Sequence, residues 1–139
     1  MTRVEIFADN IRTIIGDGPE IFWTVTTVSM PWNLHTPVTV VTVMDNDNGR
    51  WGFTFFDDTE DIRVDSPRGS VLPAVSTAYA LGLVRVQYAA TAVYAAVTAV
   101  RHTVKGTDAY ADARALEANA RAEYQAAVDA RGTVPIEGV

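Results

Sequence analysis

The sequence predicts an α+β fold, in which an N-terminal helix and a three-stranded antiparallel sheet are followed by a long antiparallel helical hairpin. β-branched and aromatic residues crowd three short segments of the first half, which favours strands. The second half carries two long runs of apolar residues at helical spacing. Only Gly106 and Thr107 separate these runs, so we expect the two helices to lie antiparallel.

The length of the chain, 139 residues, suits one domain with one core. Apolar residues make up 48% and charged residues 20%, which is typical of a globular protein. We expect this single domain, residues 1–139, to contain an α/β-sheet part over 1–69, a helical hairpin over 70–132 and a tail over 133–139.

The first helix is predicted within the segment that follows Met1. Thr2 and Glu5 have the spacing of a capping box, and Gly16 marks the end. Apolar residues fall roughly on one helical face: Ile6, Phe7, Ile11, Ile14 and Ile15. The opening residues RVEIF also fit a strand, because their branched side chains favour one.

Three strands are predicted over residues 20–29, 38–45 and 50–57. A further short edge strand is an option at the residues IRV, 62–64. The residues MPWNLHTP, which contain two prolines, interrupt the chain between the first strand and the second. After the third strand, the sequence turns acidic and then reaches a loop with proline and glycine.

The link between the second and third strands, VMDNDNGRWGF, is the densest polar motif of the chain. A calcium loop of the EF-hand type needs oxygen ligands at positions 1, 3 and 5, glycine at position 6 and glutamate at position 12. With Gly49 at position 6, Met44 falls at position 1 and Phe55 at position 12, and neither binds a cation. We therefore predict a tight hairpin turn in which Asn48 and Gly49 both take positive φ, and no metal site.

The longest predicted helix covers residues 70–106, with Ser70 as cap, Pro73 in the first turn and Gly106 at its end. Its apolar residues recur in steps of three, four and seven, as in a coiled-coil seam. Its other sides are apolar too, so we expect more than one neighbour to cover it. The predicted oligomer interface consists of Leu72, Val75, Tyr79, Val86, Val93, Val97 and Val100.

A membrane span is the alternative reading of this helix. Arg85 and Gln87 interrupt the apolar run, and the uncharged stretch over 86–100 is shorter than the roughly 20 residues that a span needs. The sequence therefore favours a covered soluble helix and no membrane partner.

The last helix is predicted over residues 107–132. Thr107 or Asp108 caps it, and Gly132 ends it. Its apolar stripe is narrow and rich in alanine, which lets a neighbouring helix approach closely. Glu117 and Arg121 form a favourable pair one turn apart on its polar side.

Charge and composition exclude several classes of function. The net charge is -6 and the arginines are scattered, which disfavours nucleic-acid binding. The absence of cysteine rules out disulfides and thiol catalysis. The opening residues MTRVEIFADN do not resemble a secretory signal, so we expect a cytoplasmic location. No cofactor motif is present, and none of the common catalytic motifs occurs, so no catalytic residue is predicted and a non-enzymatic role is favoured.

Two charged clusters each have two interpretations. The acidic residues Asp57, Asp58, Glu60 and Asp61 form either a divalent-metal or docking site or, as we favour, a solvated loop. The basic residues at the end of the long helix either complement the helix dipole, which we favour, or build an anion pocket at a subunit junction. The candidate ligand-binding residues of that pocket are Arg85, Tyr94, Arg101, His102, Lys105 and Arg114.

These observations favour a small acidic homo-oligomer that assembles through its long C-terminal helices and acts by binding another protein. The alternative is a protein that binds or sequesters a small nucleotide-like anion. An accessory protein of a phage or mobile element would suit either role, given the size and composition.

Overall fold

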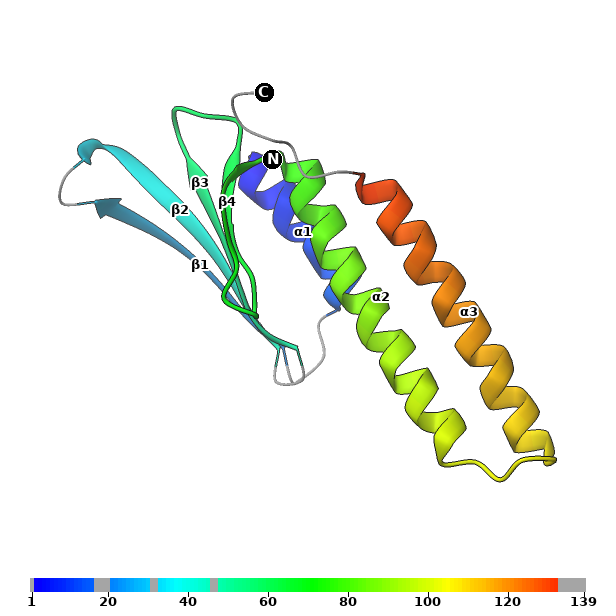
Figure 1. Ribbon diagram of the computed structural model, residues 1–139. Coiled ribbons are helices and arrows are strands. Elements are labelled where there is room, and N and C mark those ends of the chain that lie inside the picture. The colour runs from blue at the N-terminus through cyan, green and yellow to red at the C-terminus, as the bar shows by residue number, and fades with distance from the viewer. Residues whose placement is uncertain (1, 17–20, 31–32, 46–47, 133–139) are drawn as a thin grey trace. The chain divides into compact units, whose positions relative to one another are not determined.

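A computed structural model describes residues 2–16, 21–30, 33–45 and 48–132 (Figure 1). The elements, in chain order, are α1 (Arg3–Ile15), β1 (Ile21–Met30), β2 (Asn33–Asp45), β3 (Gly49–Phe56), β4 (Ile62–Asp65), β5 (Val71–Val75), α2 (Thr77–Arg101) and α3 (Asp108–Arg131). The α+β class and the C-terminal helical hairpin are confirmed. The prediction of three strands is wrong, because the sheet has five. The predicted tail over 133–139 lies outside the described residues.

The chain divides into two compact units, and the division falls inside α2. The first unit runs to Leu81 and contains α1, the whole sheet and the first turn of α2. The second begins at Gly82 and contains the rest of α2 with α3. Each unit is described below by itself.

The sheet is an antiparallel meander in which each strand pairs with the next along the chain, in the order β1-β2-β3-β4-β5. Pro37 lies in β2, an interior strand, although proline cannot donate to a ladder. The pairing of β2 with β3 starts only at Val38, so Pro37 lies where β2 has no neighbour on that side. The segment predicted as an optional edge strand is β4, which is interior because β5 pairs with it.

The core of the first unit lies between α1 and one face of the sheet. Val41, Phe53 and Val64 are opposite one another in the register of three adjacent strands, and each is buried. The ring of Phe7 from α1 meets Phe53 edge to face at 4.9 Å between centroids, and it meets Phe55 in the same way at 5.2 Å. Such aromatic pairs add to the stabilisation that burial already gives.

Helix α1 forms as predicted, and the alternative of a strand at RVEIF is wrong. The side chain of Thr2 accepts a hydrogen bond from the backbone N–H of Glu5 at 3.2 Å. Gly16, with φ of 90°, donates its N–H to the carbonyl of Arg12 and closes the helix. The buried residues Phe7, Ala8 and Ile11 form the face that packs on the sheet.

The link between β2 and β3 is a hairpin, but its geometry differs from the predicted two-residue turn. Asp45 pairs with Gly49, so the loop comprises residues 46–48, of which 46 and 47 are outside the described residues. Gly49 has φ of 90°, whereas no described non-glycine residue, Asn48 included, has positive φ. The Asn48 amide nitrogen instead donates to the Asp45 carboxylate at 3.1 Å. A side-chain bond of this kind stabilises a turn without a positive φ at the asparagine.

The predicted helix start at Ser70 is wrong, because residues 71–75 form strand β5. Proline disfavours helical geometry at the residue before it, and an edge strand tolerates its missing N–H. Pro73 lies where the register between β4 and β5 shifts. Helix α2 begins at Thr77, since the hydroxyl of Ser76 accepts from the Tyr79 N–H at 3.1 Å.

The predicted helix end at Gly106 is also wrong, because α2 ends at Arg101. The hydroxyl of Thr103 donates to the carbonyls of Ala99, at 2.7 Å, and Val100, at 3.1 Å, and the backbone N–H of Thr103 also donates to the carbonyl of Val100. These bonds satisfy the terminal carbonyls and tighten the last turn. The link between the two long helices therefore covers residues 102–107 rather than two residues.

Candidate functional site

The feature with the clearest functional meaning is helix α2, because it is long, apolar and little buried. By length and composition it is the one helix within the described residues that would be able to cross a membrane. Only 6% of the residues in its most apolar 18-residue window are fully buried, and most of the others are half-buried. A soluble core helix with this composition is normally buried by its neighbours, so α2 presents apolar surface that the described chain leaves open.

Two threonines inside α2 donate hydrogen bonds back to the carbonyls of their own helix. Thr91 donates to the carbonyl of Gln87 at 3.1 Å, and Thr98 donates to that of Tyr94 at 2.9 Å. Their hydroxyls are thereby satisfied within the helix. This leaves methyl groups among the alanines and valines, so the surface of α2 is more apolar than its residue types indicate.

The predicted interface residues divide into two groups. Val86, Val93, Val97 and Val100 lie on α2 in the second unit and are half-buried. The other members, Leu72, Val75 and Tyr79, belong to the first unit. There, Leu72 and Val75 are on β5, so they do not continue a helical stripe.

Exposure around α2 is uneven. Tyr94 is 76% exposed, and the other exposed positions of α2 are Ala78, Arg85, Ala92, Ala95, Ala99 and Arg101. The 3.6-residue repeat places Ala92, Ala95 and Ala99 on one side, turned by roughly 100° to 160° around the helix from Val93. Helix α2 therefore has a half-covered valine side and an uncovered alanine side.

Helix α3 accompanies α2 in the hairpin (Figure 1). Thr107 caps it by accepting from the Tyr110 N–H at 3.2 Å, and Ala113 is its one buried side chain among the described residues. A Cβ added at Gly82 of α2 would lie 3.2 Å from the Cα of Arg131. The two helices thus approach closely at this end, and glycine provides the space. The predicted Glu117–Arg121 pair forms, at 3.4 Å.

The candidate anion-binding residues all lie in the second unit: Arg85, Tyr94, Arg101, His102, Lys105 and Arg114. Each is exposed. Arg101 and Lys105 do not share a helical turn, because α2 has ended before Lys105. Arg85 and Arg101 are sixteen positions apart on α2, or about 24 Å at the helical rise, so one chain does not bring them together. The anion site at a subunit junction stays a prediction.

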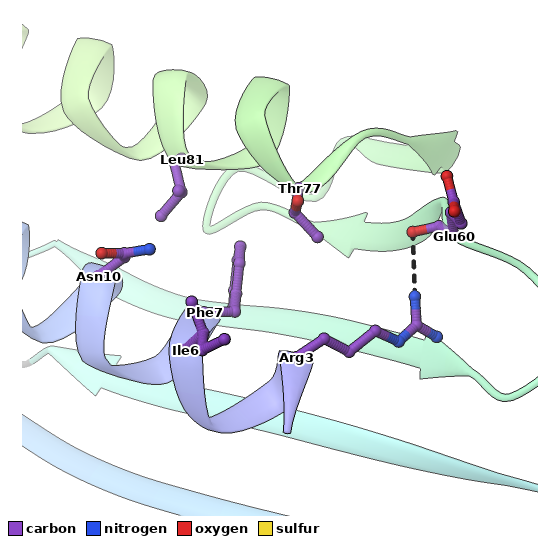
Figure 2. Close-up of a pocket in the computed structure, with 7 residues that line it drawn as sticks. All are labelled: Arg3, Ile6, Phe7, Asn10, Glu60, Thr77 and Leu81. Carbon is purple, nitrogen blue, oxygen red and sulfur yellow. Dashed lines mark hydrogen bonds between the residues drawn. The ribbon is translucent and has the colours of Figure 1, made fainter. Parts of the chain in front are cut away.

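A cavity of about 300 Å³ that sequence reasoning missed lies in the first unit (Figure 2). Figure 2 shows Phe7 between α1 and the first turn of α2, with Thr77 and Leu81 reaching toward it from α2. Its lining residues are Arg3, Ile6, Phe7, Asn10, Glu60, Thr77 and Leu81. No sequence motif pointed to it, since its residues come from three separate segments.

Arg3 at the rim of this cavity has a structural role. Its guanidinium donates to the carbonyl of Glu60 at 3.1 Å and to that of Phe56, and it lies 5.4 Å from the ring centroid of Phe55. These contacts fasten the start of α1 to the end of β3. The cavity wall combines the apolar side chains of Ile6, Phe7 and Leu81 with four polar residues.

The acidic residues at 57–61 lie in the loop between β3 and β4, and all four are exposed. Asp58, Glu60 and Asp61 line an open hollow together with Phe56, Pro73 and Ala74. Within the residues that the structure describes, no group of three histidine or carboxylate side chains is arranged to hold a metal ion.

Comparison with known proteins adds no family to these observations. No protein-family model, no curated protein and no solved structure matches the chain.

Proposed function

We propose that this chain is a small homo-oligomeric interaction protein, which assembles through the sides of α2 and acts by binding another protein. One observation carries the proposal: only 6% of the residues in the most apolar window of α2 are fully buried, which leaves the rest half-buried or exposed. Apolar surface of this extent on a soluble protein marks an interaction site. Closed symmetric homo-oligomers are the commonest assemblies of soluble chains, so a second copy is the simplest cover.

The partner helix α3 argues against a lipid bilayer as the cover. It carries a charged side chain at roughly every third position. A charge at the centre of a bilayer costs about 2.5 to 3.5 kcal/mol on insertion scales. Inserting α2 would therefore require it to leave α3, whereas a protein partner covers α2 with the hairpin intact.

The valine side of α2 is the favoured contact. Val86, Val93, Val97 and Val100 are half-buried, so α3 or another element of the chain covers them only in part. The neighbouring Ala89 and Ala96 are small enough for a second hairpin to approach closely. Four helices packed in this way would bury a shared apolar core.

Two single variants test this proposal, and each places one negative charge on a different side of α2. Val93→Glu puts a carboxylate on the valine side, and Ala95→Glu puts the same charge on the exposed alanine side. We expect Val93→Glu to dissociate the oligomer and Ala95→Glu to retain it, because a buried unpaired charge is costly. Native mass spectrometry gives the subunit number and any retained ligand, and circular dichroism confirms the helix content of both variants.

Two results would contradict this proposal. If Val93→Glu keeps the wild-type mass, the valine side is internal to one chain. If only Ala95→Glu dissociates the oligomer, the interface is the alanine side and the valine assignment fails.

A further inference from the structure

The two edges of the sheet differ in how they are protected. β5 is a short edge, Val71–Val75, in which Pro73 lacks a donor and the register shifts. β1 is the opposite edge, Ile21–Met30, with ten residues and neither a proline nor a charge in its sequence IFWTVTTVSM. Natural sheets protect exposed edges with short strands, prolines, bulges or charges. β5 has such protection, and β1 over Ile21–Val28 has none.

Side chains on both faces of β1 are open. Val25 is opposite Val41 in the register, which places it on the α1 side of the sheet, yet it is 53% exposed. Phe22 is opposite Met44 on the other face, and these two are 59% and 41% exposed. A strand added beside β1 would cover apolar side chains on both faces, whereas a helix would cover only one.

We propose that β1 pairs antiparallel with β1 of a second copy, about a two-fold axis at Val25, so that two five-stranded sheets join into one. This contact is separate from the α2 interface and does not depend on it. The added ladder would satisfy the backbone donors and acceptors along the free side of β1.

The sequence of β1 is complementary to itself in this register. Val25 is opposite Val25 of the second copy, Thr24 is opposite its Thr26, and Trp23 is opposite its Thr27. Threonine pairs and pairs of an aromatic with a β-branched residue are favourable across antiparallel strands. The sheet already contains one such pair, since the hydroxyls of Thr27 and Thr39 lie 3.4 Å apart across β1 and β2.

Charge also favours a second copy. A two-fold axis brings equivalent residues of the two copies close together, so a charged residue on the strand would repel its counterpart in the second copy. β1 carries none, although the chain has a net charge of -6. The charges therefore lie away from the strand that would have to pair with itself.

The first experiment uses the absence of cysteine from the chain. Val25→Cys places one thiol on the proposed axis, and Val71→Cys is the matched control, because it replaces a valine of similar exposure, 46%, on the other edge. Opposite residues in an antiparallel pair have Cα atoms about 4.5 to 5.5 Å apart, which a disulfide spans. Under mild oxidation, we expect Val25→Cys to form a covalent dimer on the order of tenfold or more faster than Val71→Cys, because its thiols are held together.

The second experiment separates this inference from the α2 proposal. Val25→Lys places lysines opposite each other at the axis, with Val71→Lys as control. Native mass spectrometry then compares the wild type, Val25→Lys, Val93→Glu and the double variant. If both interfaces exist, the wild type is larger than a dimer, each single variant is reduced to the assembly held by the remaining interface, and the double variant is a monomer.

The outcomes distinguish the two ideas. A loss of mass in Val25→Lys with none in Val93→Glu supports β1 pairing and contradicts the α2 interface. Equal cross-linking rates for the two cysteine variants, together with an unchanged mass for Val25→Lys, would overturn β1 pairing whatever Val93→Glu does.

Discussion

The two units of the chain obtain their burial in different ways. In the first, large side chains such as Phe53, Ile11 and Ile62 are fully buried between α1 and the sheet. In the second, the buried hydrophobic residues among those described are Val84 and Ala113. The sheet unit thus contains a core of its own, while few side chains of the hairpin are fully buried. Stability and assembly are therefore expected to reside in different residues.

Truncating the core of the sheet unit should have the largest effect on stability. Phe53→Ala removes a ring with no exposed surface that contacts both Phe7 and Trp51. We expect it to lower the free energy of unfolding by about 3 to 5 kcal/mol. The matched change in the hairpin, Leu116→Ala, removes a side chain that is 64% exposed and should cost less than about 1 kcal/mol. Urea unfolding followed by tryptophan fluorescence measures both, and equal costs would refute the contrast between the units.

Replacing one glycine in each unit by alanine tests the same difference between the units, here through the backbone. Gly49 and Gly132 both have positive φ, at 90° and 78°. An added Cβ at Gly49 would lie 2.9 Å from the Cβ of Pro67, whereas one at Gly132 would have no described atom within 4 Å. Gly132→Ala should cost about 1 to 2 kcal/mol from backbone strain alone. Gly49→Ala should cost about 2 to 4 kcal/mol, because a steric clash is added. Thermal unfolding of both variants ranks them, and the reverse order would contradict the packing at Pro67.

Tyr79 offers a change that should stabilise the sheet unit. It is only 6% exposed, and its hydroxyl has no hydrogen-bond partner in the part of the chain that the structure describes. A buried unsatisfied hydroxyl costs about 1 to 3 kcal/mol. Tyr79→Phe should therefore raise the free energy of unfolding by about 1 kcal/mol, as measured by urea unfolding. A loss of stability would show that the hydroxyl has a partner.

The smallest expected effect concerns the cap of the hairpin. Thr107→Ala removes the acceptor for the Tyr110 N–H and should cost about 1 kcal/mol, whereas Thr107→Gly should cost only a few tenths. Because the hairpin has little core to compensate, the loss should appear as earlier melting of the helical signal in circular dichroism. Equal melting of Thr107→Ala and the wild type would show that packing, not the cap, holds α3.

The sequence predicted those helices and strands whose ends are set by residues close by in the chain. The cap at Thr2 and the stop at Gly16 gave α1, and the runs of β-branched residues gave β1, β2 and β3. The hairpin at Gly49 was also predicted, as was the antiparallel pair of long helices. In each case, the interaction that sets the boundary lies within a few residues in the sequence.

The missed elements depend on contacts made far along the chain. Residues 71–75 have the sequence signals of a helix start, with Ser70 as a cap and Pro73 in the first turn. They form a strand instead, because β4 offers an edge with which they pair. The cavity beside Phe7 joins three distant segments, so no motif marks it. The exposed side of α2 was predicted only as a general excess of apolar surface. The periodicity of the sequence shows that a helix is apolar, but it does not show which side a neighbour covers.

The order of the strands also has a kinetic consequence. Each strand of the sheet pairs with the one that precedes it, so most sheet contacts join residues near in sequence. A low contact order of this kind favours rapid folding. Because α1 and all five strands precede Thr77, the core of the sheet unit is able to assemble during synthesis before most of α2 has left the ribosome. The apolar helix would then emerge beside a domain whose own interior is already closed, which limits the time for wrong contacts between them.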